Sequence, residues 1–250
     1  MEENIMKKLK LPAGFPYAYE THLHTSEGSA CGRSTGAEMA MACKNAGYSG
    51  IIVTDHFFYG NTAADRNLPW KDWVEAYCSG YDNARKMGEL IGLNVMFGWE
   101  ASYRGTDFLV YGLDKEWLIA HPEIRDASIE EQYEMVHADG GYIVHAHPYR
   151  EASYIPEIRL FPEYVDAVEV NNAAHEVGKR LPDGSVPYND KALAYARRYN
   201  FPETGGSDIH SVNLFGGGMA FSHPINNIGD YISAVKNREG IILSALDYCF

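Results

Sequence analysis

The sequence predicts an α/β fold and, within that class, a single-domain β/α barrel. Short apolar segments typical of strands alternate with amphipathic segments of helical spacing, which favours a parallel sheet with helical crossovers. The chain has 250 residues, an ordinary length for one such barrel and enough to bury a full core. Histidine or acidic residues also follow several predicted strands, and in a barrel these positions meet at one rim. An open doubly wound sheet would gather such residues only near its switch point.

The predicted strands are short apolar runs bounded by polar or glycine-containing segments. They lie near residues 18–23, 50–54, 93–98, 107–112, 141–145, 165–170 and 203–206, with two weaker ones near 218–222 and 240–244. Proline-containing segments at 57–69, 148–163 and 178–188 are expected to form loops over the site rather than domain boundaries.

Capping signals and helical spacing place the helices. One helix begins at a capping box formed by Thr35 and Glu38 and ends at Gly47. A second begins after Pro69 and buries apolar side chains at helical spacing as far as Ala84. Three further helices are expected, from Ser128 (a capping box with Glu131) to about Ala138, from Asn189 to Tyr199, and from Ile228 to Val235.

Composition limits the classes of function. The balance of 21 Lys and Arg against 34 Asp and Glu gives a formal charge of −13, which opposes extended binding to nucleic acid. A small anionic substrate remains possible where metal ions and Arg outweigh this field. The chain lacks a signal-peptide pattern, a long apolar stretch and any Cys-x-x-Cys spacing, so we expect a cytoplasmic protein without membrane contact. The oligomeric state is not predicted.

Residues that can bind metal follow the predicted strands. His22 and His24 flank the end of the first strand, and because side chains alternate across a strand, both imidazoles can reach one ion. An isolated pair of this kind is more often a surface or core feature than a pair of ligands. Here the pattern recurs at later strand ends, in the segments Thr54-Asp55-His56, Gly98-Trp99-Glu100, His145-Ala146-His147 and Ser207-Asp208-Ile209-His210. The repetition predicts one site at the rim.

Five motifs occur in a recognisable order: His22-Leu23-His24-Thr25, Thr54-Asp55-His56, Gly98-Trp99-Glu100, Ala146-His147-Pro148-Tyr149-Arg150 and Gly206-Ser207-Asp208-Ile209-His210. In this order, and spanning residues 22–210, they resemble the motifs of the PHP (polymerase and histidinol phosphatase) superfamily of metal-dependent phosphoesterases. The resemblance implies a distorted TIM-like barrel of about seven β/α units and a cluster of two or three divalent metal ions.

The resemblance also implies roles for individual residues. His22 and His24 would share one metal with Asp208 and Glu100. Glu100 would bridge to a second metal, which His147 also binds, and His56 and His210 would hold a third. Asp107 stands where many members have His, and a carboxylate can replace an imidazole as a ligand.

The third metal position departs from the family pattern. Ala30 stands where members commonly place a His or Asp ligand. Cys31 or Glu27 could substitute, or the third ion could be weakly bound or absent. The mixed imidazole and carboxylate ligands suit Zn, Mn or Fe without selecting among them.

Other residues near the motifs have open roles. Arg150 either grips phosphate or forms a rim salt bridge, and Asn171 either binds substrate or caps a loop. Asp55 is expected to orient His56 or bind backbone amides rather than touch metal, and His145 to support His147. Asp208 could accept a proton from the attacking water as well as bind metal. His121, His137 and His223 are expected in structural positions. His175, Lys179 and Arg180 are expected in a solvated loop, although they could instead contact a second anionic group.

These observations predict metal-dependent hydrolysis of a small phosphomonoester, such as histidinol phosphate or a nucleotide, with Asp208 and Glu100 as catalytic residues. One alternative is an amidohydrolase, which also begins with His-x-His. That class usually has a metal-bridging Lys or an acidic residue after a middle strand, and no Lys stands at a strand end here. A second alternative is a degenerate module with a structural or regulatory role, for which Ala30 is the best support.

Overall fold

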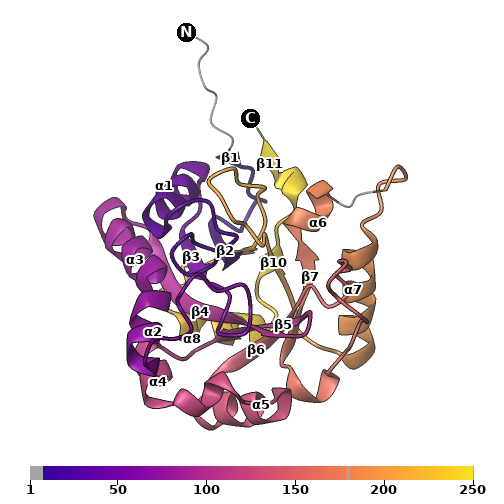
Figure 1. The fold of residues 1–250 in the computed structure, drawn as a ribbon. Helices are drawn as coiled ribbons and strands as arrows, with labels where there is room; N and C mark the ends of the chain where they lie inside the picture. Colours follow the sequence, from indigo (N-terminus) through magenta and orange to yellow (C-terminus); the bar gives the residue numbers. More distant parts are fainter. Residues whose placement is uncertain (1–7, 179–180, 250) are drawn as a thin grey trace.

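The computed structural model describes residues 8–178 and 181–249, so the predictions for Lys179 and Arg180 lie outside the described residues. Within this part of the chain, nine strands form one sheet in the order β10-β9-β2-β3-β4-β5-β6-β7-β8 (Figure 1). The strands are β2 (Tyr17–Leu23), β3 (Gly50–Val53), β4 (Asn94–Tyr103), β5 (Thr106–Tyr111), β6 (Tyr142–Ala146), β7 (Ala167–Asn172), β8 (Glu203–Gly206), β9 (Met219–Phe221) and β10 (Ile241–Ile242). A separate two-stranded sheet pairs β1 (Lys8–Leu9) with β11 (Tyr248–Cys249).

The sheet curls into a nearly closed barrel, which confirms the predicted α/β barrel. β2 and β8 approach each other at the closing seam, where Leu23 and Ile209 form an isolated parallel bridge. The Thr21 hydroxyl donates to the carbonyl of Gly205 at 2.5 Å, and the amide of Ser207 donates to the Glu20 carboxylate at 2.9 Å. Closure therefore depends on side chains as well as on the backbone.

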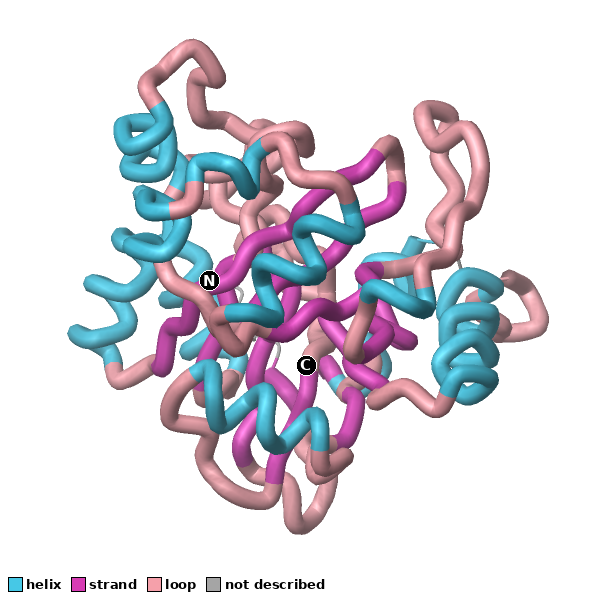
Figure 2. The backbone as a smooth tube through the Cα atoms, turned by 90° about the horizontal axis from the view of Figure 1, so that it is seen from below, coloured by secondary structure: helices cyan, strands magenta, loops and turns pink. Residues whose placement is uncertain are grey.

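Helices surround the strands on the outside of the barrel (Figure 2). They are α1 (Gly36–Ala46), α2 (Trp70–Tyr77), α3 (Ser79–Ile91), α4 (Lys115–Ala120), α5 (Ile129–Ala138), α6 (Ala173–Gly178), α7 (Pro187–Tyr199) and α8 (Ile228–Lys236). Both predicted capping boxes are present, at Thr35 and Ser128, and Gly47 ends α1 in the left-handed conformation with φ 102°. None of the helices in this described part is long and apolar enough to span a membrane.

The helix predicted after Pro69 is divided in two, which corrects the expectation of a single element. α2 ends at Tyr77 and α3 begins at Ser79, with Cys78 between them. The Ser79 hydroxyl donates to the Ala76 carbonyl at 2.6 Å, a side-chain bond that competes with the regular helical pattern. The short helices α4 and α6 were not predicted.

The sheet is mixed rather than parallel, and this is the main correction to the predicted topology. β5 runs antiparallel to both β4 and β6, because a two-residue turn at Arg104 and Gly105 joins β4 to β5 directly. Both turn residues have positive φ, 53° and 85°, as the twist of a tight hairpin requires. The reversal places Asp107, at the start of β5, opposite Ser102 and Ala146 at the rim of the barrel.

The buried core lies on both sides of the barrel wall. Trp73, Trp99 and Phe108 belong to the cluster between the sheet and the helices α2, α4 and α5. A second cluster joins Tyr19 and Tyr111 to side chains of α8 and contacts the beginnings of β2, β4 and β6. α8 covers that end of the barrel, and five of the predicted ligands line a pocket at the opposite rim.

Candidate metal centre

The structure brings all eight predicted metal ligands together at one rim. Strand ends and the turns after them supply the side chains, which form four groups whose ligand atoms lie within 4.8 Å of one another: His24, His56 and His210; His22, His24 and Glu100; His22, His147 and Asp208; and Glu100, Asp107 and His147. Two of these residues have left-handed backbone, His147 with φ 28° and Asp208 with φ 53°. Such strained conformations are concentrated at functional sites.

Glu100 lies at the middle of the cluster and is 1% exposed. One carboxylate oxygen, Oε1, lies 3.0 Å from His147 Nε2 and 3.4 Å from His22 Nε2. The other, Oε2, lies 2.6 Å from His56 Nδ1 and 3.7 Å from His24 Nε2. Burial raises the pKa of Glu100, but the surrounding histidines outweigh burial and hold it well below its usual value. The carboxylate is therefore ionised and can serve two sites.

Asp208 faces Glu100 across the histidines. Its Oδ1 lies 3.2 Å from His24 Nε2 and 3.7 Å from His22 Nε2, and its Oδ2 lies 3.8 Å from His147 Nε2. Burial raises the pKa of Asp208, yet His22 and its neighbours bring it well below its usual value. Conversely, burial lowers the pKa of His22, but nearby carboxylates raise it well above the usual value.

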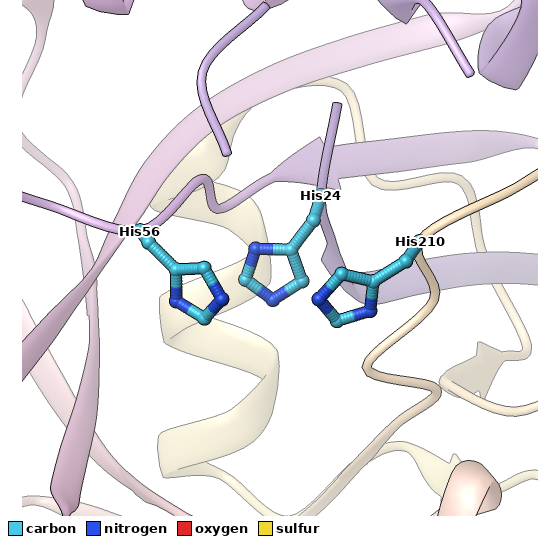
Figure 3. A group of neighbouring side chains, drawn as sticks. All are labelled: His24, His56 and His210. Atoms are coloured by element: carbon cyan, nitrogen blue, oxygen red, sulfur yellow. The ribbon is translucent and has the colours of Figure 1, made fainter. Parts of the chain in front are cut away.

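The rings of His24, His56 and His210 gather at one end of the centre (Figure 3). The His24 ring stacks on His56 with centroids 4.2 Å apart and on His210 at 4.4 Å. Burial and the positive charges of these two rings lower the pKa of His24 well below its usual value. The thiol of Cys31 is also there: burial raises its pKa, but hydrogen bonds to His210 and His56 lower it to about 6.

Several buried polar atoms in the centre have no hydrogen bond of acceptable geometry among the described residues: His22 Nε2, His24 Nε2, His56 Nδ1 and Glu100 Oε2. Leaving such atoms unpaired costs roughly 1–3 kcal/mol each. Glu100 Oε2 lies 2.6 Å from His56 Nδ1 and 3.7 Å from His24 Nε2, so these atoms border one common space. Imidazole and carboxylate donors in this arrangement fit divalent metal ions.

Asp107 and Arg150 form an ion pair beside the cluster, with Nη2 of Arg150 2.8 Å from Asp107 Oδ2. Burial lowers the pKa of Arg150, but Asp107, Asp208 and Glu100 raise it above its usual value. The guanidinium is therefore charged, and its Nε has no partner in the described structure. Both residues line a pocket of about 460 Å³, together with His56, His147, Asp208 and His210.

The structure does not bring Asn171 to this pocket. Its amide donates to the Leu243 carbonyl at 3.1 Å, and its Oδ1 accepts from Asn189 at 2.7 Å. Asn171 thus connects β7 with α7 and the segment after β10.

Asp55 holds the loop after β2 rather than pointing at the cluster. Its carboxylate accepts from the amide and hydroxyl of Thr25 at 2.6 and 2.7 Å and from the Ser29 hydroxyl at 2.7 Å. The same Ser29 hydroxyl accepts the amide of His56 at 2.9 Å. Burial raises the pKa of Asp55 to about 6.

His145 is also separate from the cluster. β6 ends at Ala146 and the backbone turns at His147, so the two side chains do not share a direction as they would in a continued strand. The His145 ring stacks on Phe108 at 5.0 Å and meets Tyr195 edge-on at 5.8 Å. Burial lowers the pKa of His145 to about 3, so its ring is neutral.

Two buried carboxylates next to the candidate ligands were not predicted from the sequence, and a third residue was placed wrongly. Glu169 on β7 lies with Oε1 2.9 Å from His22 Nδ1, and its Oε2 accepts the His147 amide at 3.0 Å. Glu20 on β2 accepts the amides of His22 and Ser207. The only signal in the sequence was an isolated carboxylate within each apolar strand. His175, expected in a solvated loop, is instead buried in α6, 6.1 Å from the His147 ring.

Comparison with known proteins agrees with this geometry. Residues 186–239 match a family model described as PHP-associated, and this segment contains Asp208 and His210. The whole barrel is similar to a two-domain protein of Bacteroides vulgatus ATCC 8482 that contains a predicted PHP-like metal-dependent phosphoesterase (14% identity, TM-score 0.67, covering 94% of this chain and 67% of that one). The resemblance to the PHP superfamily is confirmed.

Two further solved structures are similar to this barrel. One is a candidate metal-dependent phosphoesterase of Bifidobacterium adolescentis ATCC 15703 (17% identity, TM-score 0.53, covering 81% of this chain and 90% of that one). The other is an amidohydrolase of Chromobacterium violaceum whose structure holds sulfate and no metal (14% identity, TM-score 0.54, covering 91% and 98%). No curated protein matches the chain. At these identities the similarity establishes the fold, and the chemistry must be argued from the residues.

Proposed function

We propose that this protein hydrolyses a small phosphomonoester, such as histidinol phosphate or a nucleotide, with the help of two or three divalent metal ions. The observation that supports this most directly is the set of buried, unpaired imidazole and carboxylate atoms around Glu100. If nothing bound there, an apolar or fully hydrogen-bonded cluster would give the folded protein a lower free energy.

The ligand groups suggest how the ions would be held. His22, His24, Glu100 and Asp208 would hold one ion, and Glu100, Asp107 and His147 a second. His56 and His210 would contribute to a third. When bound, divalent ions lower the pKa of a water molecule and offset the charge of a phosphoryl group.

Arg150 would bind the phosphate of the substrate. Its guanidinium lines the pocket, carries a charge stabilised by neighbouring carboxylates, and keeps an Nε that has no hydrogen bond in the described structure. A planar guanidinium matches two phosphate oxygens. Asp208, ionised and 12% exposed at the pocket, would accept the proton of the attacking water.

The amidohydrolase alternative draws support from the Chromobacterium violaceum neighbour. The pocket favours phosphoester chemistry, because no lysine is present among its lining residues in the described chain, whereas Arg150 and the Asp208–His210 pair are. A purely structural role is disfavoured because the eight candidate ligands lie together and five of them, His56, Asp107, His147, Asp208 and His210, line a pocket of about 460 Å³.

The test is phosphate release from a panel of phosphomonoesters, including histidinol phosphate and nucleotides, run beside a panel of amides. Chelation should abolish the release, and Zn, Mn or Fe(II) should restore it. Glu100→Gln should lose activity, whereas Glu163→Gln, an exposed carboxylate outside the pocket, should retain it. Amide turnover without phosphate release, or activity indifferent to chelation, would refute the proposal.

A further inference from the structure

Two tyrosines line the pocket beside the metal centre with most of their surface exposed, Tyr59 at 63% and Tyr154 at 65%. We propose that their rings form a subsite for the leaving group, so that the substrate is a phosphomonoester whose alcohol carries a planar aromatic or heteroaromatic ring. The inference rests on the function proposed above and specifies its substrate class. Exposed tyrosines are ordinary on protein surfaces. These two are distinguished by their place in the pocket and by the contacts that hold them.

Tyr59 is held at several points although its ring is exposed. The Arg66 guanidinium donates to the two neighbouring carbonyls, those of Phe58 and Gly60, at 2.6 Å each. The Tyr59 hydroxyl donates to Asp126 Oδ1 at 2.5 Å, and its ring meets that of Phe58 edge-on with centroids 5.1 Å apart. These contacts order the ring without burying it. A side chain that is ordered in advance loses little conformational entropy when a ligand stacks on it.

Tyr154 lies beside the residue proposed to bind phosphate. The Cζ atom of Arg150 is 5.7 Å from the centroid of the Tyr154 ring. The loop is fixed next to Tyr154 as well: the amide of Ile155 donates to the Ala152 carbonyl at 2.9 Å. Ile155 also packs on the turn between β4 and β5, where a Cβ at Gly105 would lie 2.7 Å from Ile155 Cγ1. A phosphate on Arg150 would therefore bring its leaving group next to this ring.

The two tyrosine loops flank the hairpin formed by β4 and β5. The strands β3, β4, β5 and β6 are neighbours in this order, and Tyr59 follows β3 whereas Tyr154 follows β6. On the β3 side, a Cβ at Gly60 would lie 2.9 Å from Ser102 Oγ on β4. On the other side, Ile155 packs on the turn as described. Because Ser102 and the turn also line the pocket, both rings border the same space as the hairpin.

The size of the pocket leaves room for a ring beyond the phosphoryl group. Its volume is about 460 Å³, within the range of roughly 300–1,000 Å³ that is usual for sites of drug-sized ligands. The candidate metal ligands and Arg150 make one part of its wall strongly polar, and the tyrosines supply aromatic surface elsewhere. Aromatic rings stack favourably on such surfaces beyond the gain from burial alone, and an aliphatic alcohol lacks this contribution.

The test is calorimetric titration of the Zn²⁺-loaded full-length protein with phenylphosphonate and with cyclohexylphosphonate. Both carry a phosphonate that cannot be hydrolysed as an ester, and their six-membered rings differ in being planar and aromatic or not. The wild type should bind phenylphosphonate about fivefold more tightly. Tyr59→Ala and Tyr154→Ala should each lose most of this preference, whereas Tyr59→Phe and Tyr154→Phe, which keep the ring, should retain it. Tyr199→Ala, which removes a ring that is 45% exposed outside the pocket, is the matched control and should behave as the wild type does.

The outcomes separate this inference from the proposed function. Equal binding of the two phosphonates by the wild type, or a preference that survives in either alanine variant, overturns the two-ring subsite and leaves phosphoester hydrolysis intact. The subsite is also overturned if neither phosphonate binds. If the preference behaves as expected but no phosphomonoester in the panel above releases phosphate, the subsite stands and the proposed function fails.

Discussion

The replacement Glu169→Gln tests how the centre holds its histidines. Glu169 is 1% exposed and contacts two of the candidate ligands: one carboxylate oxygen lies against His22 Nδ1, and the other accepts the backbone amide of His147. The second oxygen also accepts the side-chain amide of Asn172 at 3.2 Å. Glutamine keeps the shape of the side chain, but an NH₂ group replaces one of the two carboxylate oxygens. That group cannot accept any of these hydrogen bonds.

The magnitude follows from the position of the contacts. A partner that orients a metal-binding histidine typically contributes roughly 10- to 100-fold in metal affinity, which corresponds to about 1.4–2.7 kcal/mol. Because Glu169 holds two ligands at once, the loss should approach the upper end. Glu169 also helps to raise the pKa of His22, so protons compete with metal more strongly in the wild type. The loss of affinity in the variant should therefore be larger near pH 8 than near pH 6.

The assay is calorimetric titration of the metal-free proteins with Zn²⁺ at both pH values, with circular dichroism to show that the fold is retained. Glu163→Gln, an exposed carboxylate in the turn before β7, is the matched control and should bind as the wild type does. Wild-type affinity in Glu169→Gln at both pH values would refute the argument that this carboxylate positions the ligands. A loss that is equal at both pH values would refute only its effect on the protonation of His22.

Three other predictions concern stability and substrate binding. Burial lowers the pKa of His145 to about 3, so the unfolded chain takes up a proton as the pH falls and the folded protein does not. Between about pH 7 and pH 5 the unfolding free energy of the wild type should therefore fall by about 2 kcal/mol more than that of His145→Leu, as measured by urea titration. Equal losses in the two proteins would contradict this. A Cβ at Gly36 would lie 2.0 Å from the Gly80 carbonyl oxygen, so Gly36→Ala should lower the unfolding free energy by about 1–3 kcal/mol, whereas Gly178→Ala, with open space around it, should change it little. Arg150→Lys removes the planar guanidinium group and should raise KM for the phosphoester about tenfold, with a smaller change in kcat, as measured by steady-state kinetics. An unchanged KM would exclude phosphate binding by Arg150.

Much of the fold could be predicted because its signals are local. The capping boxes at Thr35 and Ser128 involve residues three positions apart, and the apolar runs mark their strands without reference to the rest of the chain. The direction of β5 could not be inferred in this way. It depends on whether a two-residue turn or a helix joins it to β4, and Arg104-Gly105 is a weaker hairpin signal than Asn-Gly.

The grouping of the candidate ligands was predictable for a related reason. His22 and His24 share a face because of strand periodicity alone, and the ends of the parallel strands of a barrel meet at one rim. Glu169 was not recognised because its partners, His22 and His147, come from other strands, and their approach depends on barrel closure and register. His145 was paired with His147 on the assumption that β6 continues, but the positive φ at His147 ends that periodicity.

Barrel closure and ligand geometry depend on the same residues. One oxygen of Glu20 accepts the amides of Thr21, His22 and Ser207, which fixes the end of β2 to the residue after β8. At this seam Gly206 has no room for a side chain, since a Cβ would lie 2.6 Å from both His22 Cβ and Glu169 Oε1. His22 and Asp208 therefore approach each other because the barrel closes there, and an ion bound between them would cross-link the seam. Metal binding at this seam would therefore also stabilise the fold.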